Sequence, residues 1–253
     1  MQYSFRINSD CPVLVFLHGF LGSGEDFEAV ISRLGARYSI LTIDLPGHGK
    51  TKVSEVYTMP KIADAIAALL DTLKIPQASL FGYSMGGRLA LYLALRFPER
   101  FPKAIVESGS PGLKTEQERS QRLKRDFELA DQLETNFSQF LSKWYEQPLF
   151  QSIKQHPRFN QMIEQRSQND PVQLARSLRE MSTGAQPSLW EELSAHQNPL
   201  LLIVGECDRK FIEINREIAS ICPTAELAII PDAGHNVHFE NPEAISTQII
   251  GFF

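Results

Sequence analysis

A serine stands between two glycines in the stretch Gly82-Tyr83-Ser84-Met85-Gly86, after an apolar run and before a helical pattern. This spacing is typical of a nucleophile elbow, in which the serine sits on a strained turn between a strand and a helix. The glycines leave room where the turn packs tightly against neighbouring elements. The motif alone is weak, because a chain of this length contains it by chance in about one case in ten. Ser84 is therefore a candidate that needs partners elsewhere in the chain.

A serine hydroxyl becomes reactive when a histidine acts as its base and a carboxylate orients that histidine. In α/β-hydrolases these residues follow in the order Ser, Asp or Glu, then His, each at the carboxyl end of a strand. The apolar run LLLIVGECD ends at Asp208, and the run LAIIPDAGH leads through a turn to His235. Both residues have the expected order and context, so the sequence predicts a catalytic triad of Ser84, Asp208 and His235.

Other acidic residues and histidines fit this pattern less well. Asp44 precedes the serine, and we expect it to brace the DLPGHG turn together with His48. Asp232 is interpreted as structural, and His238 as a residue at the start of a helix. The remaining histidines precede the serine or lie within residues 113–196: His18, His156 and His196. No two histidines have the His-Glu-x-x-His spacing of zinc enzymes, which argues against a metal site.

The tripeptide His18-Gly19-Phe20 follows the apolar run Val13–Leu17. Its position is that of the loop that supplies one backbone N–H to an oxyanion hole, while the residue after the nucleophile supplies the other. We therefore expect the N–H groups of Phe20 and Met85 to form an oxyanion hole. A plain turn between a strand and a helix is the alternative.

These residues need a scaffold, and short runs rich in Val, Ile and Leu alternate with longer amphipathic segments along the chain. The predicted strands are Val13–Leu17, Ile40–Asp44, Ala78–Phe81, Ala104–Glu107, Leu200–Val204 and Leu227–Ile230. The predicted helices are Asp26–Leu34, Met59–Leu73, Gly86–Phe97, Ile212–Ile221 and Pro242–Phe253. The alternation predicts an α/β-hydrolase fold, with a mostly parallel central sheet flanked by helices.

The alternation stops between about Leu113 and Gln197, where the sequence indicates several amphipathic helices and no convincing strand. Prolines interrupt these helices at Pro148, Pro157, Pro171 and Pro187. We therefore predict a core of residues 1–112 and 197–253 and a helical cap of residues 113–196. Such an insertion would cover the carboxyl ends of the strands, where open α/β sheets bind their ligands.

Basic residues gather where the cap begins, in KTEQERSQRLKR at residues 114–125. On a helix Arg119 and Arg122 share one face. Arg88 lies in the helix after the elbow, which is normally buried, and a buried arginine needs an anionic partner from the protein or from a ligand. Arg166 lies deeper in the cap.

Lys210 follows the predicted triad acid Asp208 and adds a further cation. A substrate with several carboxylates would account for the whole set, since arginine binds a carboxylate through two parallel hydrogen bonds. A solvated charged helix is the alternative. Two aromatic residues are further candidates: Tyr83 could place a hydroxyl beside the nucleophile, and Trp144 could line the pocket from the cap. Ordinary packing is the alternative for both.

Bulk composition limits the partners of this chain. It has 253 residues and a formal net charge of −5, which argues against a nucleic-acid-binding protein. No apolar stretch approaches the roughly 20 residues of a membrane span, and the first apolar run is too short for a signal peptide. Three cysteines without metal-site spacing are expected to be buried, reduced thiols: Cys11, Cys207 and Cys222. These observations predict a soluble, cytoplasmic protein; they leave its oligomeric state open.

Seven stretches together resemble one family over nearly the whole chain, cap included. They are VFLHGFLGSGEDF, IDLPGHGKT, GYSMGGR, ESGSPGL with the arginine-rich helix after it, KWYEQPLF, GECDRKF and AGHNVHFENP. The chain is similar to the 2-succinyl-6-hydroxy-2,4-cyclohexadiene-1-carboxylate synthases of menaquinone and phylloquinone biosynthesis. LHGF, GYSMGG and AGH are common to the wider superfamily, whereas ESGSPGL, KWYEQPLF and the arginines discriminate this family.

The resemblance implies a lyase that eliminates pyruvate from a tricarboxylate cyclohexene without a cofactor. It implies that basic contacts to the substrate come from Arg88, Arg122 and Arg166, with Tyr83, Trp144 and Lys210 nearby. Two other readings remain open from the residues themselves. A hydrolase of small carboxylic esters or C–C bonds would use the same triad, and a non-enzymatic binding protein can share the fold.

Overall fold

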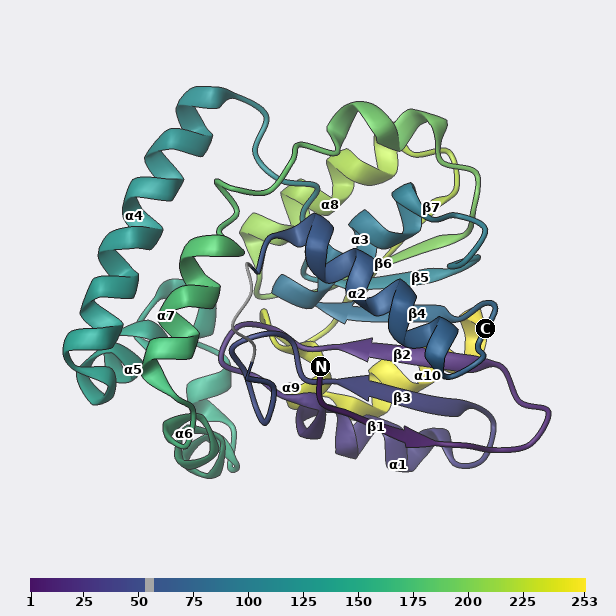
Figure 1. The fold of residues 1–253 in the computed structure, drawn as a ribbon, viewed down its shortest axis with the longest axis horizontal. Helices are drawn as coiled ribbons and strands as arrows, with labels where there is room; N and C mark the ends of the chain where they lie inside the picture. The colour runs from purple at the N-terminus through teal and green to yellow at the C-terminus, as the bar shows by residue number, and fades with distance from the viewer. Residues whose placement is uncertain (53–56) are drawn as a thin grey trace.

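The computed structural model describes residues 1–52 and 57–253, and a seven-stranded sheet forms its centre (Figure 1). The strand order is β1-β3-β2-β4-β5-β6-β7; β1 is antiparallel to β3, and the other neighbours are parallel. The strands are β1 (Tyr3–Arg6), β2 (Val13–Leu17), β3 (Ser39–Ile43), β4 (Ser79–Tyr83), β5 (Ala104–Glu107), β6 (Leu200–Gly205) and β7 (Ala225–Ile230). The predicted mostly parallel sheet is confirmed, and the six predicted strands fall on β2 to β7.

The edge strand β1 has no counterpart among the predicted strands. Its sequence YSFR leaves three residues exposed and one half-buried, so it lacks the continuous apolar run that marks a strand buried on both faces. Its register on β3, with Tyr3 opposite Ile43, is set by backbone hydrogen bonds rather than by a buried side-chain pattern.

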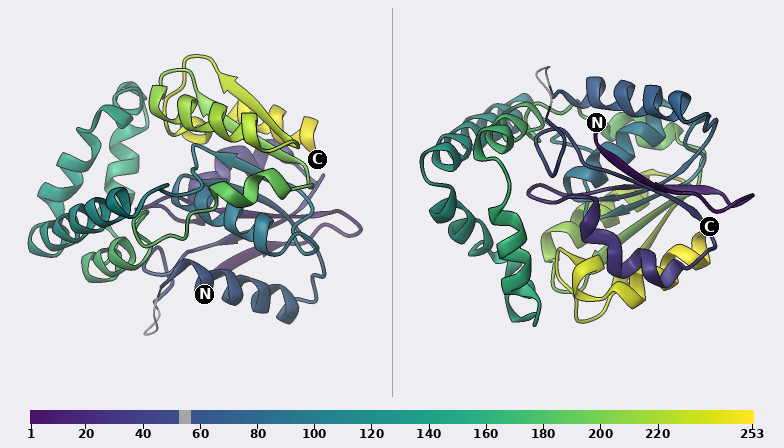
Figure 2. Two further views of the ribbon diagram at one scale, coloured as in Figure 1. Left: turned by 90° about the horizontal axis from the view of Figure 1, so that it is seen from above. Right: turned by 60° about the horizontal axis from the view of Figure 1, so that its bottom comes forward.

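Helices cover both faces of the sheet, as the two views in Figure 2 show. One face packs against α1 (Glu28–Leu34) and α10 (Pro242–Phe252), which share an apolar cluster with the strands. The other face packs against α2 (Met59–Thr72), α3 (Met85–Arg96) and α8 (Arg209–Ile221). These are the five predicted helices, although the start of the first forms a separate 3-10 turn, η1 (Gly24–Phe27). A short helix, α9 (Val237–Glu240), precedes α10.

The chain between β5 and β6 is a helical insert that lies beyond the carboxyl ends of the parallel strands (Figure 1). Its α-helices are α4 (Glu116–Thr135), α5 (Phe137–Tyr145), α6 (Phe159–Ser167) and α7 (Pro171–Glu180), and its 3-10 helices are η2 (Pro148–Phe150), η3 (Ile153–Gln155) and η4 (Trp190–Ala195). Pro148 and Pro171 each begin a helix, where a fixed φ and a missing N–H are tolerated. The division into core and cap at residues 113 and 196 stays a prediction.

The cap has its own apolar cluster, which joins helices α4, α5 and α7 through residues such as Leu133, Phe140 and Leu174. One buried residue of the core, Leu21, is part of this cluster, and the half-buried Phe20 and Phe239 pack against it. Leu21 lies in the loop after β2, beside the predicted oxyanion residue Phe20. Apolar burial therefore attaches the cap to the part of the core where the site is expected.

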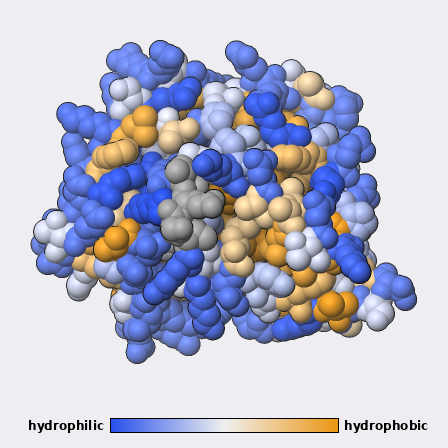
Figure 3. All heavy atoms as spheres, viewed as in Figure 1, coloured by the Kyte–Doolittle hydropathy of each residue, from blue (hydrophilic) through white to orange (hydrophobic). Residues whose placement is uncertain are grey.

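The face of the molecule drawn in Figure 3 is mostly polar, and the three cysteines differ in exposure. Figure 3 shows hydrophilic residues over much of one face, with hydrophobic residues in scattered groups. In the described residues no helix is both long and apolar enough to cross a membrane. Of the three cysteines only Cys222 is buried; Cys11 is half-buried and Cys207 is exposed, so the expectation of three buried thiols is wrong for these two. A cytoplasmic location stays a prediction.

Candidate active site

The structure brings Ser84, His235 and Asp208 together in one hydrogen-bonded chain. The Nε2 atom of His235 lies 3.0 Å from Ser84 Oγ, and its Nδ1 atom lies 2.7 Å from Asp208 Oδ2. The histidine and aspartate side chains are each 2% exposed. These are the distances and the order of contacts that let a histidine accept a serine proton while a carboxylate holds the imidazole.

Ser84 sits on a strained turn between β4 and α3. Its φ of 50° and ψ of −105° lie in a region that residues with a side chain rarely adopt. The flanking glycines allow this turn, because a Cβ on Gly86 would overlap the carbonyl group of Leu17 and a Cβ on Gly82 would overlap that of Gly86. The local geometry is therefore that of the predicted elbow.

Asp208 and His235 are each held at the end of a strand. Asp208 is the N-cap of α8, where its Oδ1 accepts a hydrogen bond from the backbone N–H of Phe211 at 3.4 Å. The ring of His235 lies 4.6 Å from that of Phe211 and 5.9 Å from that of Phe150, centroid to centroid. An aromatic ring from the core and one from the cap thus limit the orientation of the catalytic imidazole.

Phe20 and Met85 both line the same cavity as Ser84. Met85 is the first residue of α3, so its N–H has no partner within the helix. Among the described residues neither this N–H nor that of Phe20 has a hydrogen-bond partner. Two unpaired donors beside the serine support the predicted oxyanion hole, which stays a prediction.

A cavity of about 460 Å³ lies between the core and the cap and contains Ser84 and His235 on its wall. Its apolar side includes Trp144, Leu149 and Phe150. Its charged side is mixed, with the cations Arg88, Lys114, Arg122, Arg125 and Lys210 and the anions Glu118, Asp126 and Glu217. Five cations against three anions give the wall an excess of two positive charges, so the cavity suits a small anion.

Arg88 reaches this cavity from the core helix α3. Its guanidinium donates hydrogen bonds to Gln186 Oε1 at 2.8 Å and to the carbonyl oxygen of Met181 at 2.7 Å. Both acceptors are neutral, so the described residues that bond to Arg88 do not balance its charge. Burial and, second, the charge of Arg122 lower the pKa of Arg88 to about 10, which still keeps it protonated at neutral pH. The charge of Asp126 acts on Arg88 without a hydrogen bond between them, and a contact of Arg88 with an anionic ligand stays a prediction.

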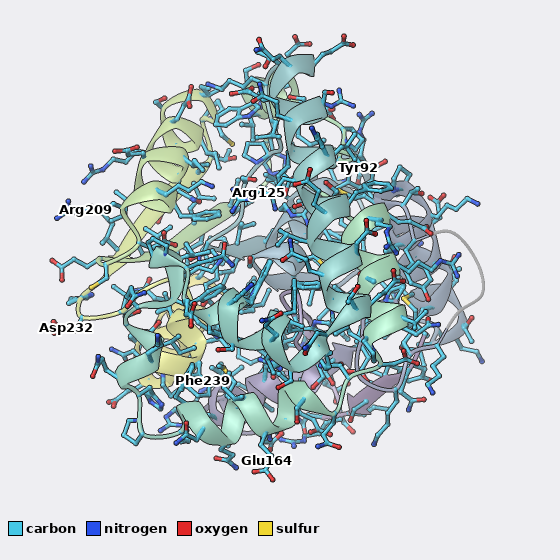
Figure 4. The ribbon with its side chains drawn as sticks, turned by 90° about the vertical axis from the view of Figure 1, so that its left-hand side faces the viewer. Tyr92, Arg125, Glu164, Arg209, Asp232 and Phe239 are labelled. Atoms are coloured by element: carbon cyan, nitrogen blue, oxygen red, sulfur yellow. The ribbon has the colours of Figure 1, made fainter. Side chains whose placement is uncertain are left out.

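Arg122 reaches the cavity from the cap helix α4. Its Nε atom donates to both carboxylate oxygens of Asp126, at 2.8 and 2.9 Å. Among the described residues its two terminal nitrogens have no hydrogen-bond partner, which leaves one edge of the guanidinium available. Partial burial and the charge of Arg122 lower the pKa of Lys210, which also lines the cavity. A further cation of the lining, Arg125 of α4, is labelled in Figure 4.

The two aromatic candidates have different positions. Trp144 lines the cavity, stacks on Phe140 at 5.5 Å and contacts Phe20 at 5.2 Å between centroids. Tyr83 is not among the residues that line the cavity; its ring packs against His238 at 4.6 Å. Burial, with the charge of Glu107, raises the pKa of Tyr83 well above its usual value. Tyr83 packs against His235 and His238, and its expected contact with the substrate stays a prediction.

Arg166, like Arg122, is paired with a carboxylate of the protein. Its terminal nitrogens donate to the two oxygens of Asp26 at 2.7 and 2.8 Å. It lines a different hollow, beside Gly22 and Asp44, and not the cavity that contains Ser84. In this structure the partner of Arg166 is a protein carboxylate, and its expected contact with the substrate stays a prediction.

The residues set aside as competitors have structural partners. Asp44 accepts hydrogen bonds from the backbone N–H groups of Gly24 and Lys50, each at 2.9 Å, while His48 contacts the carbonyl oxygen of Pro46 within the turn and not Asp44. His238 is the second residue of α9, and its Nδ1 lies 2.9 Å from both oxygens of Glu107. The sequence patterns missed this buried pair, because nothing local links residues 131 positions apart. Residues 1–52 and 57–253 contain no group of three or more potential metal ligands.

The comparison with known proteins agrees with this geometry. The sequence pattern of the α/β-hydrolase fold matches residues 12–242, so the chain belongs to the α/β-hydrolases. The putative 2-succinyl-6-hydroxy-2,4-cyclohexadiene-1-carboxylate synthase of Bacillus subtilis is 39% identical over 246 residues, which cover 94% of this chain and 89% of that protein. The synthase of Enterobacter sp. is 36% identical, covering 93% and 89%. The chain thus belongs to the 2-succinyl-6-hydroxy-2,4-cyclohexadiene-1-carboxylate synthase family.

Further comparisons place this family in a wider context. The structure of MenH from S. aureus superposes on this chain with a TM-score of 0.94 and 36% identity, and the match covers 99% of this chain and 97% of the MenH chain. Protein PHYLLO of Arabidopsis thaliana is 35% identical over 93% of this chain, which spans only 15% of PHYLLO's length. An enol-lactonase from Burkholderia xenovorans, 20% identical with a TM-score of 0.85, shares the fold.

Proposed function

We propose that this protein eliminates pyruvate from 2-succinyl-5-enolpyruvyl-6-hydroxy-3-cyclohexene-1-carboxylate and so forms 2-succinyl-6-hydroxy-2,4-cyclohexadiene-1-carboxylate. Its relatives are named as synthases of this product. The observation that carries it here is a hydrogen-bonded triad that opens into a cavity with excess positive charge. A base and a cluster of cations are what the deprotonation of a tricarboxylate requires.

The first step removes the acidic proton from the carbon next to the succinyl ketone. His235 accepts the hydroxyl proton of Ser84, and the serine oxygen takes the proton from carbon. Asp208 holds the imidazole through Nδ1 and stabilises the positive charge that develops on it. The 3.0 Å separation of His235 Nε2 and Ser84 Oγ makes the serine a relay for this proton.

Negative charge then develops on the ketone oxygen. The N–H groups of Phe20 and Met85 are the donors proposed to hold that oxygen, and one such donor typically contributes about 3 kcal/mol to the transition state. The electron pair moves through the ring alkene and breaks the C–O bond to the enolpyruvyl group. The proton held by His235 is available to the departing enolpyruvate, which becomes pyruvate.

The substrate carboxylates are proposed to bind the cations of the cavity wall. Arg88, Arg122 and Lys210 line the cavity that contains Ser84, and Trp144 supplies an apolar wall for the ring. Fixing the carboxylates fixes the acidic carbon against the serine, which lowers the entropic part of the barrier. The elimination removes a proton, shifts the ring alkene pair and breaks the C–O bond within the substrate, so it needs no acyl-enzyme intermediate.

A coupled assay tests this function. The substrate is generated enzymatically from its precursors, this protein is added, and pyruvate release is followed together with the ultraviolet absorbance of the diene. Wild type, Ser84→Ala and Arg122→Ala are measured side by side. We expect wild type to release pyruvate and diene in equal amounts, and both variants to lose most of kcat/KM.

The same assay distinguishes the proposed lyase from a hydrolase. An absence of acceleration over the spontaneous reaction would overturn the proposed function. Turnover of small carboxylic esters or diketones by wild type, lost in Ser84→Ala, would then assign the triad to hydrolysis through an acyl-enzyme or a bound water. A protein that only binds its ligand would show no turnover of either kind.

A further inference from the structure

Residues 181–186, which follow α7, contact Arg88 directly and Arg122 through Asp126; we call them the support segment. Two of its residues bond directly to Arg88, which belongs to the core. A third, Ser182, bonds to Asp126, the partner of Arg122 in the cap. One short stretch of chain therefore sets the position of two guanidinium groups that come from different parts of the fold.

On the Arg88 side the support segment supplies neutral acceptors. One terminal nitrogen of the Arg88 guanidinium donates to Gln186 Oε1, and the other donates to the carbonyl oxygen of Met181. Gln186 is 2% exposed, and its Nε2 atom has no hydrogen-bond partner among the described residues. The hydrogen bonding of this buried amide is thus confined to its oxygen, which holds Arg88.

On the Arg122 side the support segment acts through a carboxylate. Asp126 is 1% exposed and receives Arg122 Nε on both oxygens. Its Oδ2 also receives the hydroxyl of Ser182 at 2.7 Å. A buried carboxylate with three hydrogen bonds is fixed in orientation, so it fixes the plane of the guanidinium that it holds.

The support segment is itself held tightly. The N–H groups of Ala185 and Gln186 both donate to the carbonyl oxygen of Ser182, and that of Gly184 donates to Ser182 Oγ. A Cβ on Gly184 would come within 2.5 Å of the carbonyl oxygen of Arg119 on α4, so only glycine allows this close approach. The segment is therefore a compact turn packed against the helix that carries Arg122.

We propose that Gln186, Ser182 and Asp126 are positioning residues that fix Arg88 and Arg122 as two distinct carboxylate-binding positions for the substrate. This rests on the proposed function, because it assigns the substrate carboxylates to that same cavity. The three residues act through the arginines and do not touch the reacting atoms.

The two positions differ in charge. Arg88 has neutral partners and keeps a full positive charge, whereas the charge of Arg122 is matched by Asp126. Arg88 is therefore the stronger site for an anion, and Arg122 contributes mainly directed N–H donors. A substrate with one carboxylate would use only the first position, so the pair favours a substrate with two or more.

Double-mutant cycles in the coupled assay test this assignment. Gln186→Met keeps the side-chain length but removes the acceptor for Arg88, and Ser182→Ala removes the hydroxyl that orients Asp126. We expect each to raise KM about tenfold with a smaller change in kcat, as for a lost hydrogen bond to a charged group. In an Arg88→Ala background, Gln186→Met should add less than about twofold, because its target is gone. Ser182→Ala should likewise add little in an Arg122→Ala background.

Ser182→Thr, which keeps a hydroxyl, should recover most of the affinity lost in Ser182→Ala. Thermal unfolding of every variant distinguishes a protein that has lost its fold from a folded protein in which an arginine is displaced. Wild type that does not release pyruvate would sink the proposed function itself. Wild type that turns over while Gln186→Met and Ser182→Ala leave KM unchanged would overturn the support role. The support role would also be overturned if Gln186→Met or Ser182→Ala raised KM as much in the arginine-to-alanine background as in wild type.

Discussion

Arg166 and Asp26 form a two-fold hydrogen-bonded ion pair that joins cap helix α6 to the 3-10 turn after the predicted oxyanion loop. The two bonds measure 2.7 and 2.8 Å, and the side chains are 7% and 8% exposed. Asn169, just beyond α6, adds a hydrogen bond of 3.0 Å to the carbonyl oxygen of Leu21. The cap is thus attached to the loop that carries Phe20 by a charged contact and a neutral one.

Breaking this ion pair should destabilise the protein strongly. Arg166→Ala leaves the Asp26 carboxylate buried without a counter-charge, which typically costs about 3–5 kcal/mol. Urea unfolding at neutral pH measures the loss. The exposed pair of Arg96 and Glu192 is the control, because Arg96→Ala should cost less than about 1 kcal/mol. Equal losses in the two variants would contradict the assignment of Arg166 to a structural role.

The same pair predicts how stability depends on pH. Burial alone would raise the pKa of Asp26, but the charge and hydrogen bonds of Arg166 outweigh it and lower that pKa below its ordinary value. A carboxylate whose pKa is lower in the folded state stabilises the protein above its unfolded pKa, near 3.9, and loses this contribution as the pH falls through the folded pKa. The difference in unfolding free energy between wild type and Asp26→Asn should therefore shrink below about pH 4. A difference in unfolding free energy that stays constant from neutral to acid pH would contradict a lowered pKa of Asp26 in the folded protein.

Replacing a glycine of the elbow should damage both fold and activity. A Cβ on Gly86 meets the backbone of Leu17, which cannot move without disturbing β2. We expect Gly86→Ala to lower Tm and to abolish most pyruvate release. Gly251 in α10 is the matched control, since a Cβ there meets nothing within 4 Å. Gly251→Ala should leave activity unchanged and stabilise the helix by up to about 1 kcal/mol; a similar fall in Tm for both would remove the steric explanation.

Asp208→Asn should show how much of kcat depends on the orientation and charge of His235, which the variant still contains. The amide keeps the shape of the side chain but favours the wrong tautomer of His235 and no longer stabilises its charge. We expect kcat to fall by about 10²- to 10⁴-fold, the usual contribution of a positioned acid or base. Asp232 lies on an exposed turn at a φ of 56°, which asparagine tolerates, so Asp232→Asn serves as control. Comparable kcat values for the two variants would remove Asp208 from the proposed triad.

The local patterns of the sequence predicted the sheet and the spatial meeting of Ser84, Asp208 and His235. Each of these residues follows a strong apolar run, and parallel strands end at one edge of the sheet. The strand β1 escaped prediction because its side chains are exposed. The ion pair of Arg166 with Asp26 and the bond of Arg88 to Gln186 join residues 140 and 98 positions apart. No local spacing encodes such partners, so the sequence indicated a cluster of cations without showing which were already paired.

The cap leaves the sheet at Glu107 and returns at Leu200, on two strands that lie side by side. A different helical insert could be grafted between these points without changing the strand order. Such a chimera would also inherit Asp26 from the core, and an insert without an arginine at the place of Arg166 would leave that buried carboxylate unpaired. An exchange of caps therefore succeeds when the new insert keeps a cation at this place, or when Asp26 is replaced by a neutral residue at the same time.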